Sequence, residues 1–275
     1  MKYDPVKDSL SKVVGRSVLL RQLFYTALGV FFLREWYVKR ELRVLLKSGS
    51  VKRLWDAGSG FGQYSYYCAR RRPDLPILAV DVKKEEIEEC TRFFARRRLS
   101  GVTFAVEDLT EAQHVRAFDL ILSVDVMEHI EDDVAVFRNF AASLAPGGRV
   151  LINTPSSFGG SDVHGPEDAS FIEEHARTGY EPSELRTKLA DAGLVVEKQV
   201  LTYGRLGSTA WRLGIKYPIQ LVNISKLFFL LLPFYYLITL PFTLTLMYLD
   251  YRGHNARGTG LLVIARKPDR GSPAT

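Results

Sequence analysis

Cysteine is scarce in this chain. Its 275 residues include only two cysteines, Cys68 and Cys90, which fall in segments that we predict to be helical. The two cysteines lack the spacing of a metal site, and two isolated cysteines do not suggest a disulfide framework. We therefore expect buried or neutral thiols in a reducing compartment.

We also expect no cleavable signal peptide, because the first residues are polar and mixed in charge. The net charge of +6 would suit nucleic acid or an anionic membrane surface. However, the arginine runs at residues 70–72 and 96–98 lie near the ends of predicted helices, where cations complement the helix dipole. Solvated helix ends are the simpler interpretation of these runs.

Strand and helix signals alternate between residues 51 and 154. Such alternation predicts a parallel sheet covered by helices on both faces. The length suits one α/β domain with additions, and a hydrophobic fraction of 47% is ample for its core.

The segment 54–62 is a buried strand that runs into a turn, with glycine at three alternate positions starting at Gly58. Glycine has no side chain, so a ligand can touch the main chain of such a turn. The dinucleotide-binding fingerprint needs glycine at the sixth position, which here is Gln63. The pattern is instead GxGxG, preceded by the acidic residue Asp56.

Four more motifs follow the turn. The strand 77–81 ends in Asp81, whose carboxylate can accept two hydrogen bonds from a ribose diol. The other three are strand 102–106 followed by Glu107 and Asp108, strand 118–123, and a turn and strand at 144–155. Together, in this order, the five motifs resemble the class I S-adenosylmethionine (SAM) dependent methyltransferases.

This resemblance implies a doubly wound, mostly parallel, seven-stranded α/β sheet with helices on both faces, the Rossmann-like methyltransferase fold. A helix opens at Pro182 and ends near Gly193, before a sixth strand at 194–201. The last strand, 260–267, would be antiparallel and would lie between the fifth and sixth.

The resemblance also implies a SAM site across the carboxyl ends of the first strands. The glycine turn would meet the methionine and ribose part, Asp81 the ribose hydroxyls, and Asp108 the adenine amino group. The alternative for Asp56 is a structural carboxylate bonded to the amides of the turn. The expected cofactor-binding residues are Asp56, Gly58, Ser59, Gly60, Gly62, Asp81, Val82, Glu107, Asp108, Leu109, Ser123 and Val124.

An oxygen nucleophile normally has to lose a proton, and a histidine can act as base near neutral pH. His129 and His175 are the candidate catalytic residues, although His129 could instead serve packing or helix capping. We expect His164, Arg177 and Tyr180 to bind the acceptor, with Arg177 pairing with an anionic group.

Asp125, Glu128 and His129 have the spacing of the Glu-x-x-Glu-His motif of ubiquinone-pathway O-methyltransferases and small-RNA 3′-end methyltransferases. Two carboxylates and an imidazole could hold Mg²⁺ or Zn²⁺. The first position is the shorter Asp, and Glu-His also recurs in metal-free relatives. We therefore expect no metal, with this triplet as the alternative.

We divide the chain into an N-terminal helical segment (1–50), a methyltransferase domain (51–203 and 259–268) and an insertion (204–258). The apolar stretch at 23–33 is too short to span a bilayer comfortably, but it could cover the active-site mouth or lie at a membrane interface.

The insertion contains 23 successive residues without a charge, 227–249. One helix of this length could cross a bilayer, but a single crossing would leave the last two strands on opposite sides of it. The segment must cross twice, dip in and return, lie in the interface, or pack against protein. Pro233 and Pro241 would break or kink a helix and favour a bent or re-entrant form.

We expect a SAM-dependent methyltransferase at the cytoplasmic face of a membrane. Its acceptor would be lipid-like (an isoprenoid, a quinone precursor or a lipid head group), methylated at oxygen. One alternative is a SAM-binding scaffold without catalysis. The other is an RNA methyltransferase, which is less favoured because the chain shows no added RNA-binding motif. The oligomeric state stays open.

Overall fold

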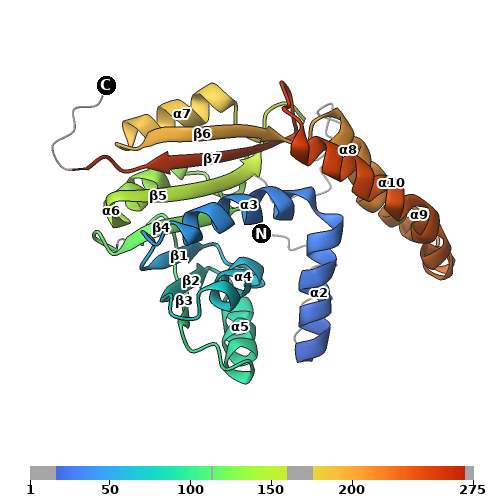
Figure 1. Cartoon of the computed structure of the whole chain (residues 1–275), viewed down its shortest axis with the longest axis horizontal. Coiled ribbons are helices and arrows are strands. Elements are labelled where there is room, and N and C mark those ends of the chain that lie inside the picture. The colour runs from blue at the N-terminus through green and yellow to red at the C-terminus, as the bar shows by residue number, and fades with distance from the viewer. Residues whose placement is uncertain (1–16, 113, 160–175, 270–275) are drawn as a thin grey trace.

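The computed structural model describes residues 17–112, 114–159 and 176–269. These residues contain one sheet of seven strands together with helices (Figure 1). The strand order is β3-β2-β1-β4-β5-β7-β6, and only β7 runs antiparallel to its neighbours. The strands are β1 Leu54–Ala57, β2 Ile77–Asp81, β3 Val102–Val106, β4 Phe118–Val124, β5 Leu144–Pro155, β6 Val195–Thr202 and β7 Gly260–Arg266. The predicted fold class is confirmed, including the place of the last strand.

Hydrophobic side chains cover both faces of the sheet. Successive residues of a strand point to opposite faces, and accordingly Leu54 and Trp55 of β1 belong to different core clusters. Both side chains are fully buried. A short, continuously buried run of this kind is typical of a parallel strand between two helical layers.

Helices α6 (Asp133–Ser143) and α7 (Pro182–Asp191) supply one apolar layer, and α3 (Leu33–Lys47) and α4 (Gln63–Arg71) supply the other. The remaining helices of this part of the chain are α2 (Val18–Phe31), α5 (Lys84–Arg96) and the short 3₁₀ turn η1 (Met127–His129).

The N-terminal segment divides into two helices with different surroundings. Phe32 interrupts them, with extended backbone angles. Val38 and Leu42 of α3 are fully buried in the core cluster of the sheet. Helix α3 is therefore an integral layer of the domain, whereas α2 stands against α4 and α5 (Figure 1).

Asp56 joins β1 to α4 beneath the glycine turn. Its carboxylate is buried and accepts a 2.6 Å hydrogen bond from Ser65 Oγ. Burial raises the pKa of Asp56 to about 6, against an ordinary value of 3.8, and the hydrogen bond from Ser65 opposes this rise. The turn amides of Gly58 and Ser59 instead donate to the carbonyl of Val80.

The insertion forms a helical hairpin, which we call the arm (residues 204–258). Helix α8 (Arg205–Trp211), the π-helical turn η3 (Arg212–Lys216) and α9 (Tyr217–Ile224) lead outward, and α10 (Leu232–Arg252) returns (Figure 1). The chain reverses at η4 (Lys226–Leu230), before Pro233. No break occurs at Pro241, which lies inside the continuous helix α10.

Asp250 fixes the base of the arm. This buried carboxylate accepts hydrogen bonds from Gly207 N (2.9 Å), the Tyr37 hydroxyl (3.0 Å) and the Asn255 amide (3.2 Å). A Cβ atom at Gly207 would lie only 2.8 Å from the Asp250 carboxylate. The outward and returning parts of the arm thus meet at one carboxylate, which also joins them to α3.

Replacing Asp250 with alanine should lower the free energy of unfolding by about 2–4 kcal/mol, because the buried N–H of Gly207 loses its acceptor. Urea unfolding measures the change. Asp191→Ala, which removes an exposed carboxylate at the end of α7, should stay close to the parent protein. Equal stability of the two variants would contradict this account of the arm base.

Asp56→Asn should change how stability depends on pH. The pKa of Asp56 is raised in the folded state, so its contribution to stability is present below pH about 4 and is lost as pH rises through about 6. The free energy of unfolding of Asp56→Asn relative to the parent should therefore rise by about 1 kcal/mol between pH 5 and pH 7.5. A difference that is constant across these pH values would rule out the buried ionisation.

Candidate active site

The three glycines of the turn after β1 have positive φ angles: 84° at Gly58, 47° at Gly60 and 72° at Gly62. Gly58 also lacks space for a side chain, because a Cβ atom there would lie 2.3 Å from a methyl carbon of Val126. Around Gly60 the nearest atom, a Glu86 oxygen, is 3.7 Å from the position of a Cβ. Gly60 is therefore the point where a ligand can approach the main chain.

Asp81 faces this turn from the end of β2. One carboxylate oxygen accepts a 2.9 Å hydrogen bond from Gly60 N, and the other accepts a 3.0 Å bond from Lys83 N. These bonds fix the carboxylate at the carboxyl edge of the sheet. A carboxylate offers about four acceptor positions, so Asp81 can still accept hydrogen bonds from a ligand diol, and exposed Val82 follows it.

Two buried hydroxyls near the turn have no hydrogen-bond partner among the described residues, Ser59 Oγ and Ser123 Oγ. The pairing of β1 with β4 brings both residues to the carboxyl edge, with half-buried Val124 next to Ser123. A buried polar group without a partner is costly and calls for an explanation. A bound ligand with polar groups would provide it, so these residues fit the expected cofactor.

The segment after β3 is held by its own hydrogen bonds. Asp108 accepts bonds from Thr110 N (2.8 Å) and Thr110 Oγ1 (2.7 Å), and the side chain of Leu109 is buried. Glu107 contacts His114 Nε2 at 3.0 Å. The imidazole of His114 lies edge-on to Trp55, with ring centroids 4.9 Å apart. His114 has no place in the family motifs, so sequence reasoning missed it.

The structure does not gather Asp125, Glu128 and His129 into a metal site. Asp125 has a φ of 54° and pairs with the guanidinium of Arg34. Buried Glu128 accepts a 3.0 Å hydrogen bond from Thr154, and His129 is half-buried in η1. Over the described ranges, no group of three His, Cys, Asp or Glu side chains is placed to hold a metal ion.

Arg34 brings the N-terminal helices to the active-site edge. It lies in the first turn of α3, pairs with Asp125 just past the end of β4, and donates its backbone N–H to the Tyr203 hydroxyl at 3.0 Å. Asn153 of β5 donates a 3.0 Å bond to the other oxygen of Asp125. Nothing in the sequence near Arg34 indicates this contact, because its partners are 91 and 169 positions away.

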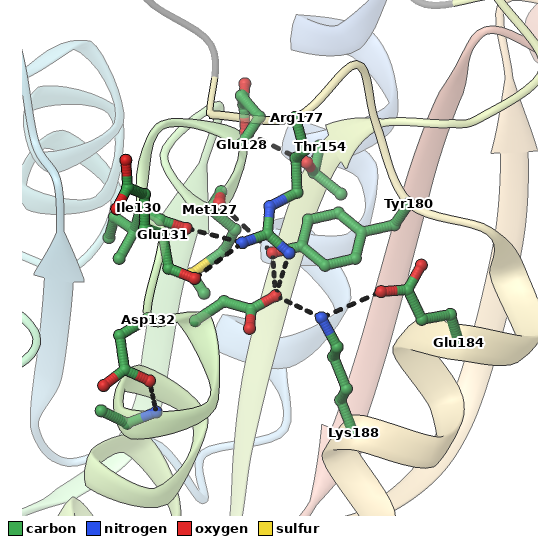
Figure 2. Close-up of polar contacts among 12 residues, drawn as sticks. Met127, Glu128, Ile130, Glu131, Asp132, Thr154, Arg177, Tyr180, Glu184 and Lys188 are labelled. Atoms are coloured by element: carbon green, nitrogen blue, oxygen red, sulfur yellow. Dashed lines mark hydrogen bonds and ion pairs between the residues drawn. The ribbon is translucent and has the colours of Figure 1, made fainter.

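Arg177 and Tyr180, which we expected at the acceptor, belong to an internal polar network (Figure 2). The Tyr180 side chain is fully buried, and its hydroxyl donates to Asp133 at 2.7 Å. Burial raises the pKa of Tyr180 well above its ordinary range. Arg177 also pairs with Asp133 and donates to the Ile130 carbonyl at 2.8 Å. A buried tyrosine and an internally paired arginine are poorly placed to contact an acceptor.

Lys188 of α7 completes this network, with its Nζ 2.8 Å from Asp133 Oδ2 and 2.9 Å from Glu184 (Figure 2). The network therefore ties the segment before α7 to the start of α6. His164, which we expected at the acceptor, and His175, which we expected to be catalytic, lie outside the described residues.

Comparisons with known proteins agree with this geometry. Residues 55–150 match a family model described as a methyltransferase domain. Phosphoethanolamine N-methyltransferase 1 of Triticum aestivum is 33% identical over 156 residues, covering 54% of this chain and 29% of that protein. A ubiquinone biosynthesis O-methyltransferase of Neisseria meningitidis is 27% identical over 169 residues, covering 58% of this chain and 70% of that protein.

Solved structures share the fold. A putative sarcosine dimethylglycine methyltransferase from Galdieria sulphuraria superposes with a TM-score of 0.59 at 18% identity, over 86% of this chain and 84% of that chain. Phosphoethanolamine N-methyltransferase 2 of Haemonchus contortus, crystallised with SAM, has a TM-score of 0.59 at 19% identity, over 94% of this chain and 60% of that chain.

The chain spans about a third of the length of the first curated relatives, with 29% and 37% of two plant phosphoethanolamine N-methyltransferases covered. The part shared with these proteins is the methyltransferase domain, and the matched segment 55–150 contains Gly60 and Asp81. The matched segment and the shared fold support a class I SAM-dependent methyltransferase domain in this chain.

Proposed function

We propose that this protein transfers a methyl group from SAM to a small, lipid-related acceptor. The observation that carries the proposal is the contact between Gly60 N and the Asp81 carboxylate. It sets the open main chain at Gly60 opposite an acid that could accept hydrogen bonds from a ribose. Both lie at the carboxyl edge of the sheet, where open α/β sheets bind ligands.

When bound, SAM supplies a methyl group that is activated by its positive sulfur. The turn at Gly60 would receive the methionine part, Asp81 would accept hydrogen bonds from the ribose hydroxyls, and Asp108 would lie near the adenine. Ser59 and Ser123, whose buried hydroxyls lack protein partners among the described residues, would donate to polar atoms of the cofactor. Methyl transfer is a displacement at carbon, so the main task of these residues is to hold the reactants in line.

The names of the relatives indicate the chemical class of the acceptor. Their names specify phosphoethanolamine and ubiquinone biosynthesis, both of which concern small lipid-related molecules. The match to the ubiquinone O-methyltransferase covers 70% of that protein, against 29% and 37% of the two plant phosphoethanolamine N-methyltransferases. This favours oxygen as the methylated atom, and His129 in η1 is the described candidate for the base that removes its proton.

The arm supports a membrane location. Helix α10 has 21 residues, a mean hydropathy of 1.4 in its most apolar stretch, and 11% of that stretch buried. Within the described part of the chain it alone is long and apolar enough to cross a membrane. The arm leaves the sheet where Thr202, Gly260 and Pro155 are paired, at the carboxyl edge that holds the cofactor site. We propose that the arm holds the enzyme at the cytoplasmic face of a membrane, next to its acceptor.

Gly60→Arg and Asp81→Ala should each weaken SAM binding by about tenfold or more. The arginine side chain would fill the open space at a backbone φ that disfavours it, and the alanine removes the carboxylate that receives the diol. Isothermal titration calorimetry measures the affinity, and circular dichroism checks that each variant is folded. If both folded variants bind SAM as the parent protein does, the cofactor site is wrong.

Incubation with methyl-labelled SAM and a membrane extract should place the label in the organic lipid fraction, and Asp81→Ala should abolish it. Label in RNA instead would favour the alternative of a nucleic-acid methyltransferase. SAM binding without label in any fraction would favour a scaffold. Either result would overturn the proposed acceptor.

A further inference from the structure

Helix α10 carries an apolar stripe along its full length. Its large exposed side chains lie on one side of the helix, given 3.6 residues per turn. The stripe consists of Phe234, Leu237, Ile238, Phe242, Tyr248 and Leu249, each between 48% and 76% exposed. The arm projects away from the domain, so among the described elements no other helix covers this face (Figure 1).

The opposite face of α10 is covered by the outward part of the arm. Thr243 and Met247 are buried there. The hydroxyl of Tyr235 donates to the carbonyl of Leu213 at 2.7 Å, and that of Tyr236 to the carbonyl of Gly214 at 2.9 Å. These bonds satisfy the polar groups of η3 and orient the stripe away from α8 and η3.

The charges of the arm outside its base have one sign. No Asp or Glu occurs between Lys198 and Asp250, whereas Arg205, Arg212, Lys216 and Lys226 lie in this stretch. An apolar helical face accompanied only by cations suits the boundary region of a bilayer that contains anionic lipids.

The arm is poorly suited to crossing a bilayer as a hairpin. Arg212 and Lys216 lie near the middle of its outward part, and a crossing would carry them into the hydrocarbon at a cost of about 2.5–3.5 kcal/mol each.

We infer that the arm lies in the plane of one leaflet of an anionic bilayer, with the α10 stripe in contact with the acyl chains. The inference rests on the proposed membrane location and adds its orientation and the class of lipid. It also sets the carboxyl edge of the sheet beside the surface, because β6 and β7, which flank the arm, meet at Thr202 and Gly260 next to the end of β5.

Sedimentation with lipid vesicles tests whether the α10 stripe binds an anionic bilayer. The parent protein should bind vesicles of phosphatidylcholine with about 30% phosphatidylglycerol, and bind pure phosphatidylcholine less well. The double variant Leu237→Ser with Phe242→Ser should bind the anionic vesicles about tenfold more weakly. Val44→Ser, which changes a 63% exposed side chain on α3, is the matched control and should bind like the parent.

Unchanged binding by the double variant would overturn the inference. The inference would also be overturned if the stripe were an interface between two copies of the chain. Sedimentation velocity without lipid would then show a dimer for the parent protein and a monomer for the double variant. SAM affinity, measured without lipid, shows that the variant is folded. A parent protein that binds vesicles but transfers no methyl would refute the proposed function and leave the docking surface standing.

A depth measurement tests the orientation. The native Cys68 and Cys90 are buried, so a maleimide fluorophore should react with a cysteine introduced at Ile238, Leu249 or Asn223. Quenching of the fluorophore by spin-labelled lipids measures its depth in the bilayer. Labels at Ile238→Cys and Leu249→Cys should lie at equal depth. A label at Asn223→Cys, near the tip, should be reduced by dithionite added outside the vesicles. Protection of the tip label would mean that the hairpin crosses the bilayer.

Discussion

The antiparallel pairing of β7 with β5 and β6 decides how the rest of this molecule is arranged. Because β6 ends and β7 begins at the same edge of the sheet, everything between them must leave and return at that edge. Pro155, at the end of β5, pairs with Gly260, so this edge is also the carboxyl edge of the parallel strands. The pairing therefore places a large apolar arm beside the site where a doubly wound sheet binds its ligand.

Buried polar groups then join the arm and the N-terminal helices to the site. Asp250 ties α8 and α10 to Tyr37 of α3. Three residues before Tyr37, Arg34 pairs with Asp125 at the end of β4. Removing one partner from such a contact leaves a buried polar group unpaired and is costly, so these contacts fix one arrangement of the elements that they join. Helix α3 is thereby both a layer of the core and the link between arm and active-site edge.

Local patterns in the sequence were sufficient to locate the strands, the glycine turn and Asp81 along the chain. Each of these is specified by short-range rules: buried runs of branched and aliphatic residues form parallel strands, and a turn with positive φ angles needs glycine. The role of a side chain is not specified by such local rules. Arg177 and Tyr180 have the chemistry of an acceptor site, but the structure pairs them with Asp133, 44 and 47 positions earlier in the chain.

The sequence by itself determined the fold class, the order of the motifs and the presence of an uncharged apolar segment before the last strand. Periodicity and glycine spacing are local properties, and they survive in any arrangement of the chain. Only the tertiary structure decided that this segment is the returning half of a hairpin, that Arg34 reaches Asp125, and that Ser59 and Ser123 are buried hydroxyls without protein partners among the described residues. Each of these facts depends on contacts between residues far apart in the chain, which no local pattern encodes.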